Sequence, residues 1–270
     1  MIKIKPNIVF VVMLLLGLTM FFYPTASYLY SAKHNSKVVA TYNRQVSHLP
    51  LIDYQMLIDK AKRYNDNLYH DRYNFFSKNW KKTYENEIKI GQSGVMGYID
   101  ISDVNIHLPI YHGSDESVLQ IGAGHLEYSS LPVGGKNTHC VLSAHTGLPS
   151  ARMFDDIHKL KKGSTFVIHV LKKNLTYQVD QIKIVNPNQV RDIRIIKDKD
   201  LCTLVTCTPM GLNNKRLLVR GHRIKQSKIK KKNISYIETI PTYAYIALAV
   251  LFVSIVIGGV AYKKKNCCSH

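Results

Sequence analysis

The stretch that decides the fold is TLVTCTP at 203–209, together with RLLVRGHRI at 216–224. Both are short runs of aliphatic and β-branched residues, which is typical of β-strands. Pro209 cannot donate a hydrogen bond to a neighbouring strand, so the first strand should stop there. We expect the two strands to pair, which would bring Cys207 and Arg216 together at their adjoining ends.

Similar short runs precede this pair. β-rich segments separated by turn residues occur at 95–101, 105–111, 138–144, 165–171 and 175–185. In the same region, helices are predicted only at 114–121 and 150–160. Many short strands with few helices between them favour a closed barrel or a sandwich. No internal repeats are present.

Length and composition exclude several classes of protein. The chain has 270 residues, of which 46% are hydrophobic, so a globular protein of one or two domains is expected. Five cysteines are too few, and odd in number, for a disulfide scaffold. The net charge is +19, but ten lysines lie at the two ends of the chain, beside apolar segments. We therefore expect no nucleic-acid partner, because no Arg/aromatic RNA-binding pattern accompanies the charge.

Two apolar segments bracket the chain. Residues 7–23 follow two lysines and precede Pro24, which we expect to end the segment. This pattern indicates a signal peptide or an uncleaved signal anchor, and the anchor is favoured because no small-residue cleavage site stands out. Residues 241–262 carry no charge and precede Lys263 to Lys265, which predicts a transmembrane helix with a stop-transfer signal. Basic residues at 225–232 leave the orientation open on charge alone.

Residues 31–92 connect the first apolar segment to the strands. Apolar residues recur at steps of three and four between Leu51 and Ala61, which predicts an amphipathic helix. Residues 69–92 are polar and aromatic without a clean period, and indicate an irregular connection.

Cys207 is the first candidate for chemistry. It ends an apolar strand and lies between two threonines, where a thiol can meet a substrate. A cysteine thiol has a pKa of about 8.5 and needs a base or a cationic neighbour to react well at neutral pH. Cys140 and Cys202 lie among apolar neighbours and are expected to be buried structural thiols.

His145 and Arg216 are the candidates to assist that thiol. His145 follows the apolar run CVLSA and could transfer a proton, although chemistry alone leaves other histidines open: His125, His139, His169 and His222. Arg216 begins the strand after the cysteine loop, where a fixed guanidinium could bind an oxyanion or a substrate carbonyl. No His or Cys pairs show zinc-ligand spacing, so no metal is expected.

Together these segments resemble the active-site signature of sortases. TLVTCTP and RLLVRGHRI carry the cysteine and arginine parts, and LSAHTGLPSARMFDDIHKLKKG at 142–163 is similar to the histidine segment of class C, pilus-polymerising sortases. The segments GVMGYIDI, LPIYHG and GHLEYSSLPVGG also resemble that class. The resemblance covers roughly 94–224 almost continuously.

The resemblance implies a mainly β fold, a sortase-type closed barrel of about eight strands with short helices, at 93–225. The remaining segments would be a signal anchor at 1–30, a helical extension with a lid region at 31–92, a basic linker at 226–240, a transmembrane helix at 241–262 and a cytoplasmic tail at 263–270. The enzyme would lie in the cell membrane of a Gram-positive bacterium with its catalytic domain on the extracellular face.

The resemblance also implies an activity. Cys207 would cleave an LPXTG-like sorting signal of a pilin between Thr and Gly and hold the pilin as a thioester. His145 would act as general acid and base, and Arg216 would stabilise the oxyanion or position the peptide. A lysine amine of another pilin would accept the acyl group, without any cofactor. The substrate-binding loop would include Thr206, Thr208 and Asn213.

Two features depart from the class. Class C sortases usually carry a lid with an Asp-Pro-aromatic motif over the cysteine, but residues 64–92 contain no proline and offer only Asp71-Arg72-Tyr73. We therefore expect a degenerate or absent lid, with Asp71 and Tyr73 as its remnants. Met210 stands where an aromatic residue is common.

Other functions remain open from the sequence. The same chemistry could anchor surface proteins to cell-wall peptidoglycan, and a secreted thiol protease would use a similar site. A non-catalytic membrane scaffold that binds pilins would not need a thiol. The class C motifs and the second apolar segment favour the joining of pilins.

Overall fold

The computed structural model describes residues 6–71, 75, 80–91 and 94–225. By its contacts the chain divides after Tyr30, and the unit that begins at Ser31 contains the strands. The predicted linker at 226–240, transmembrane helix at 241–262 and tail at 263–270 lie outside the described residues.

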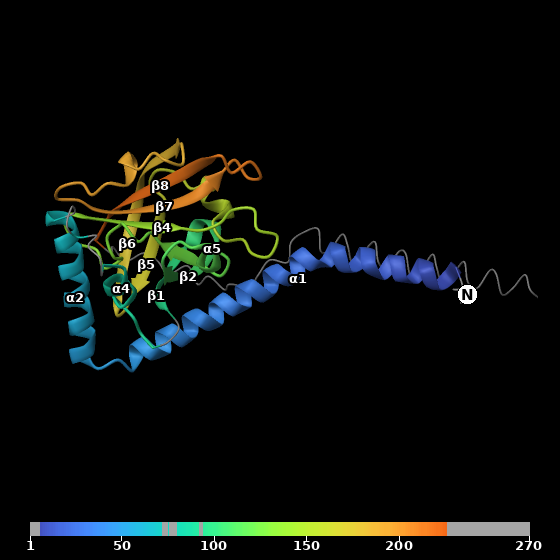
Figure 1. The fold of residues 1–270 in the computed structure, drawn as a ribbon, viewed down its shortest axis with the longest axis horizontal. Coiled ribbons are helices and arrows are strands. Elements are labelled where there is room, and N and C mark those ends of the chain that lie inside the picture. Colours follow the sequence, from blue (N-terminus) through green and yellow to red (C-terminus); the bar gives the residue numbers. More distant parts are fainter. Residues whose placement is uncertain (1–5, 72–74, 76–79, 92–93, 226–270) are drawn as a thin grey trace, which may run out of the picture. The chain divides into compact units, whose positions relative to one another are not determined.

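Eight strands close into a barrel, as predicted, in the order β1-β2-β3-β4-β7-β8-β6-β5 (Figure 1). The β2–β3 and β4–β7 pairs are parallel, and the other neighbouring pairs are antiparallel. The core fills the barrel with aliphatic and aromatic side chains. The strands are β1 (Val95–Ile101), β2 (Ile106–His112), β3 (Ala123–His125), β4 (Thr138–Ser143), β5 (Thr165–Val170), β6 (Lys173–Val185), β7 (Asp200–Thr208) and β8 (Lys215–Arg223).

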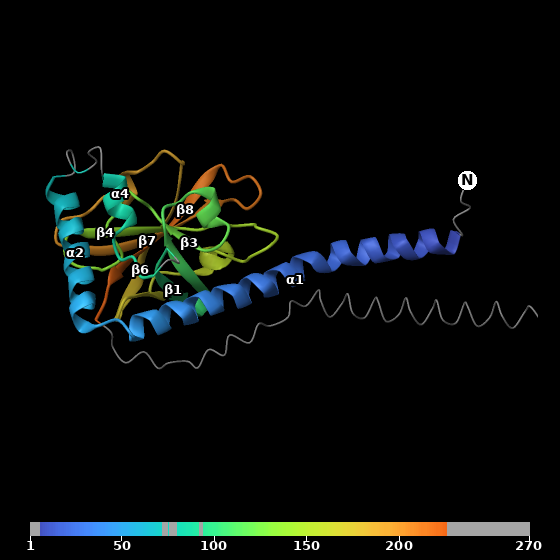
Figure 2. The ribbon, with the colours of Figure 1, turned by 60° about the horizontal axis from the view of Figure 1, so that its bottom comes forward.

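In the described part of the chain, the α-helices are α1 (Pro6–Ser47), α2 (Leu51–His70), α4 (Trp80–Glu85) and α5 (Glu116–Leu119), and α2 lies beside the barrel (Figure 2). The prediction that Pro24 ends the first helix is wrong, because Pro24 lies inside α1. A proline removes one backbone hydrogen bond, and here the helical turns on either side of it persist. The predicted helix at 150–160 is also wrong. Only a 3₁₀ turn forms, at Asp155–Lys159, because the backbone N–H of Phe154 donates to the carbonyl of His145 (2.9 Å).

One helix among the described residues is long and apolar enough to cross a bilayer. It is the part of α1 from Val12 to Ser47, in which an 18-residue stretch has a mean hydropathy of 1.5 and is almost wholly unburied. Length and composition thus support an N-terminal membrane segment.

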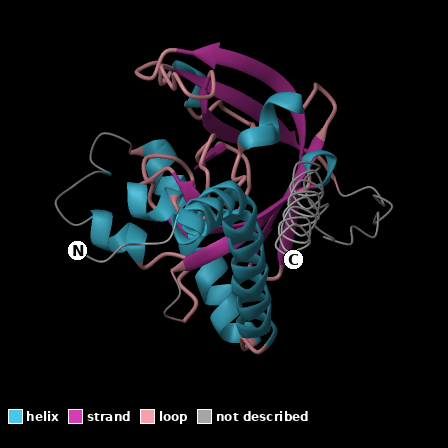
Figure 3. Cartoon of the chain, turned by 90° about the vertical axis from the view of Figure 1, so that its right-hand side faces the viewer, coloured by secondary structure: helices cyan, strands magenta, loops and turns pink. Residues whose placement is uncertain are grey.

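The last turns of α1 are fastened to the barrel by Tyr42. Its side chain is fully buried, and its hydroxyl donates to the carbonyl of Met96 (2.9 Å) and accepts from the N–H of Leu171 (2.7 Å). Burial raises the pKa of Tyr42 well above its usual range, so the proton needed for the first bond stays in place. The hydroxyl therefore joins α1 to β1 and to the turn after β5. Figure 3 shows the strands of the barrel, in magenta, from a direction 90° away from that of Figure 1.

A carboxylate between two histidines links three neighbouring strands. Asp100 of β1 accepts hydrogen bonds from His107 of β2 and from Nε2 of His169 of β5 (2.9 Å), and Tyr98 stacks on His169 at 4.3 Å between centroids. Burial opposes ionisation of this carboxyl, but the two hydrogen bonds and the nearby imidazoles outweigh it and hold the pKa of Asp100 well below its usual range. The ionised carboxylate therefore stabilises the seam where β5 closes the barrel on β1.

Replacing Tyr42 by Phe should lower the free energy of unfolding by about 1–3 kcal/mol, because a buried carbonyl and a buried N–H both lose their partner. Urea denaturation of the full-length protein in a neutral detergent measures this. Tyr54→Phe on the partly exposed face of α2 is the matched control and should change stability by less than about 0.5 kcal/mol. Equal stability of the two variants would show that the Tyr42 hydroxyl does not fasten the helix.

Replacing Asp100 by Asn should destabilise the protein at pH 7 by about 1–3 kcal/mol, because charge-assisted bonds are lost. A carboxyl with a depressed pKa stabilises the fold above its unfolded pKa of about 3.9, and that contribution is lost as the pH falls through the folded pKa. The difference from the wild type should therefore narrow below about pH 4. Denaturation curves at pH 7 and pH 3 test this, with the exposed Asp103→Asn as control. A gap that stays constant with pH would contradict the ionised state.

Candidate active site

Strands β7 and β8 carry Cys207 and Arg216 side by side. The two residues are in register, followed by Thr208 opposite Lys215, which confirms the predicted pairing of the strands. Residues directly opposite in an antiparallel pair face the same side of the sheet, with Cβ atoms about 5 Å apart. β7 continues through the half-buried Cys207 to Thr208, so a sheet rather than a loop holds the thiol.

The parallel pairing of β4 with β7 brings His145 to the same end of the barrel. Ser143 is opposite Val205, and the pairing continues beyond β4, where the N–H of Ala144 donates to the carbonyl of Val205 (3.2 Å). His145 is the next residue. Its carbonyl accepts from Phe154, so the backbone on both sides of the imidazole is fixed.

Glu116 of α5 contacts the imidazole of His145. The distance from Oε1 of Glu116 to Nε2 of His145 is 3.1 Å, and Gln120 donates to the same oxygen (2.6 Å). These bonds, first from Gln120 and then from His145, lower the pKa of Glu116. The carboxylate is fully exposed, so solvent screens its charge. The sequence alone did not indicate this contact, because the two residues are 29 positions apart and no local pattern links them.

The guanidinium of Arg216 is held by the loop that joins β7 to β8. Its Nη1 donates to the carbonyls of Asn213 (3.0 Å) and Lys215 (3.1 Å). Asn213 has a φ of 53°, in the left-handed region, and its N–H donates to the carbonyl of Pro209 (3.0 Å), which closes the loop. The loop thus limits where the guanidinium can lie beside Cys207.

The residues predicted for the substrate loop lie in two environments. Thr206 is buried, and its hydroxyl donates to the carbonyl of Ala144 (2.8 Å), so it joins the strands that carry the cysteine and the histidine. Thr208 is half-buried at the end of β7, and Asn213 is exposed in the loop. Their roles in binding a substrate stay predictions.

The predicted lid remnants lie after α2. Asp71 is exposed directly beyond that helix, and the N–H of Phe75 donates to its carbonyl (2.9 Å). Tyr73 lies outside the described residues. Asp71 comes two residues after Tyr69, which lines a cleft with Thr138, the first residue of β4. His145 lies beyond the opposite end of that strand.

The other two thiols of the barrel are shielded. Cys140 and Cys202 are buried, as predicted, and lie opposite each other on β4 and β7. Burial raises the pKa of Cys202, which keeps this thiol protonated. Of the three cysteines in the described residues, only Cys207 reaches solvent, as a nucleophile must.

The arrangement is suited to covalent catalysis. An accessible thiol, an imidazole and a guanidinium lie at one end of adjacent strands, and a thiol of this kind can attack a carbonyl when a base and an oxyanion donor are near. Among the described residues, no group of three or more His, Cys, Asp or Glu side chains could hold a metal ion. The roles of Cys207, His145 and Arg216 stay predictions.

Comparison with known proteins identifies the family. The sortase domain model matches residues 99–224. A comparison with curated proteins gave no match. The crystal structure of sortase C1 from Streptococcus agalactiae has 46% sequence identity and a TM-score of 0.68, and the match covers 71% of this chain and 100% of that chain.

Two further solved structures agree. Clostridium perfringens sortase C, with the C-terminal cell wall sorting motif, has 43% identity and a TM-score of 0.63 over 70% of this chain and 99% of that one. Sortase C of Streptococcus pneumoniae, described in terms of catalysis and pilin substrate specificity, has 38% identity and a TM-score of 0.62 over 70% and 97%. By this identity over most of its length and by its closed barrel, the chain belongs to the class C sortases and is a cysteine transpeptidase.

Proposed function

We propose that this sortase joins pilin subunits to one another at the outer face of the cell membrane. Its donor substrate is a pilin that ends in an LPXTG-like sorting signal, and its acceptor is a lysine amine on a second pilin. The proposal is supported by the register of Cys207 with Arg216 and by the parallel strand that brings His145 beside them.

In the first step the sulfur of Cys207 attacks the carbonyl carbon of the signal's threonine. Negative charge develops on the carbonyl oxygen, where the Arg216 guanidinium stabilises it. The bond to the glycine nitrogen then breaks, and His145 gives a proton to the leaving amine. The products are a thioester on Cys207 and the released C-terminal peptide.

In the second step the ε-amine of a lysine attacks the thioester carbonyl. His145 accepts a proton from the attacking nitrogen, the carbon–sulfur bond breaks and an isopeptide bond forms. Because a thioester keeps enough reactivity for capture by an amine, the step needs no nucleotide. The roles of His145 in the two steps are opposite, and an imidazole serves both near neutral pH.

The anchoring follows the same proposal. Helix α1 crosses the membrane at its N-terminal part, and residues 241–262 form a second span, so that the barrel works outside. The barrel occupies 93–225, and the substrate-facing loop includes Thr208 and Asn213. The degenerate lid at Asp71 and Tyr73 leaves the thiol open to small molecules.

The experiment combines the full-length protein in a neutral detergent with a pilin fragment that ends in an LPXTG signal, followed by intact mass spectrometry. We expect a pilin adduct on Cys207 and then covalent pilin dimers. Cys207→Ala should abolish both products. His145→Ala should slow dimer formation at least about 100-fold, because general acid–base catalysis contributes about that much or more. The exposed His158→Ala is the matched control and should retain activity.

The other outcomes separate the alternatives. An adduct that gives hydrolysed pilin instead of dimers, and that passes the pilin to a peptidoglycan cross-bridge peptide when this peptide is added, would support the anchoring of surface proteins to the wall. Binding of the pilin without any adduct would support a non-catalytic scaffold. Equal loss of activity in His145→Ala and His158→Ala would remove His145 from the mechanism.

Cys207 should react with a small charged thiol reagent within seconds to minutes, whereas Cys140 and Cys202 should stay unlabelled in the folded protein, since burial shields them. Peptide mass mapping after timed labelling measures each site separately. Strong protection of Cys207 that is lost in Asp71→Ala or Tyr73→Ala would instead show a working lid.

A further inference from the structure

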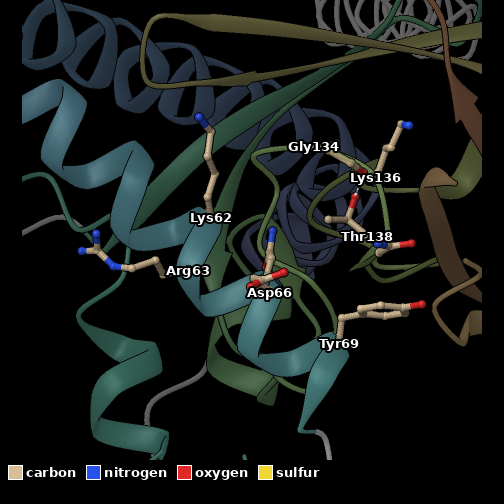
Figure 4. Close-up of a pocket in the computed structure, with 10 residues that line it drawn as sticks. Lys62, Arg63, Asp66, Tyr69, Gly134, Lys136 and Thr138 are labelled. Carbon is tan, nitrogen blue, oxygen red and sulfur yellow. Dashed lines mark hydrogen bonds between the residues drawn. The ribbon is translucent and has the colours of Figure 1, made fainter. Parts of the chain in front are cut away.

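A basic cleft lies between α2 and the loop that leads into β4, and the proposed transpeptidation does not use it (Figure 4). Two adjoining cavities of about 360 and 340 Å³ form it and share Lys62, Gly134 and Gly135. In Figure 4, Lys62 and Arg63 come from the helix, and Lys136 comes from the loop across from it. The cations that line the basic cleft are Lys62, Arg63, Lys136, Lys173 and Arg223.

The acidic residues at the basic cleft offset only part of this positive charge, because five cations face Asp66 and Asp200, and Asp59 pairs with Lys62 alone (3.7 Å). Both oxygens of Asp200 accept hydrogen bonds from neutral groups, one from the N–H of Gly135 (2.8 Å) and the other from the hydroxyl of Tyr177 (2.9 Å). Asp66 lies 3.4 Å from Nε2 of His70 on its own helix. Among the described residues, neither Lys136 nor Lys173 has an ion pair.

The cations also crowd one another. Burial, and then the charges of Lys62 and Arg223, lower the pKa of Lys173. Nη1 of Arg223 is buried without a hydrogen-bond partner, and the guanidinium lies 5.7 Å from the ring of Tyr177. Like charges held close together destabilise the empty cleft, and an anion placed among them would relieve that repulsion.

The lining of the basic cleft indicates the chemistry of the anion. The apolar side chains of the lining are only Val133, Leu175 and the ring of Tyr69, so a peptide would find few apolar anchors in the cleft. Arginine and lysine are suited to phosphate, which arginine binds through two hydrogen bonds and lysine as a point charge. Two adjoining cavities that share three lining residues offer room for more than one phosphate.

We infer that the basic cleft binds a chain of phosphodiesters, such as a polymer of glycerol phosphate. This site is separate from the catalytic end of the barrel. Asp200 begins β7 and Cys207 lies seven residues further along, which corresponds to about 23 Å at roughly 3.3 Å per residue. Such a ligand would hold the enzyme on a phosphate-rich polymer while leaving Cys207 open to its substrate.

Titration calorimetry of the full-length protein in a neutral detergent, with a soluble glycerol phosphate oligomer, tests the inference. Binding should weaken as salt rises, since counterions are released. Lys62→Gln/Lys173→Gln should raise the Kd at least tenfold and flatten the salt dependence. Lys161→Gln/Lys162→Gln removes the same charge from an exposed turn outside the cleft and should leave the Kd within twofold. Thermal unfolding checks that both variants are folded.

Three other probes distinguish the sources of the anion. Inorganic phosphate should bind more weakly than the oligomer, because it fills one part of the cleft. Tight binding of short-chain phosphatidylglycerol without binding of the oligomer would overturn the inference in favour of a lipid headgroup. A polyglutamate peptide that binds as tightly as the oligomer would overturn it in favour of an acidic protein. If the two double variants bound the oligomer equally weakly, the net charge of the protein rather than the basic cleft would account for binding, and the inference would be overturned.

Discussion

The parallel pairing of β4 with β7, flanked by β8, is the constraint on which the rest of the molecule depends. Parallel neighbours run in the same direction, so both strands end at one edge of the barrel. Cys207 lies at the end of β7, and His145 lies just beyond the end of β4. β8 then returns from that edge and sets Arg216 opposite the cysteine. Backbone hydrogen bonds between these strands thus bring three residues, separated by up to 71 positions of sequence, to one end of the barrel.

The same pairing divides the barrel into two ends of different chemistry. The end of β7 carries the thiol and His145 follows the end of β4, whereas the first residues of these strands, Asp200 and Thr138, border the basic cleft. Between these ends, the wall of the barrel is closed by buried groups such as Cys140 opposite Cys202. The barrel therefore acts as a rigid spacer, and a group bound at one end need not disturb the other.

The strands were largely predictable because their signal is local. Runs of alternating or continuous apolar residues bounded by turns marked seven of the eight strands within a few residues. β3 was missed because it has three residues, two of them Ala and Gly, and is defined only by its partners. The helix predicted at 150–160 failed for a related reason, since a backbone bond from Phe154 to His145 competes with helical bonding.

The sequence by itself determined the fold class, the family resemblance and the identity of Cys207, His145 and Arg216 as candidates, because strand periodicity and short motifs are written in neighbouring residues. The tertiary structure alone decided that Glu116 contacts His145, that Cys140 lies opposite Cys202, and that Lys62, Lys136 and Lys173 line one cleft. Those contacts join segments far apart in the chain. Which segments meet depends on how the barrel closes, and no local pattern of residues records that.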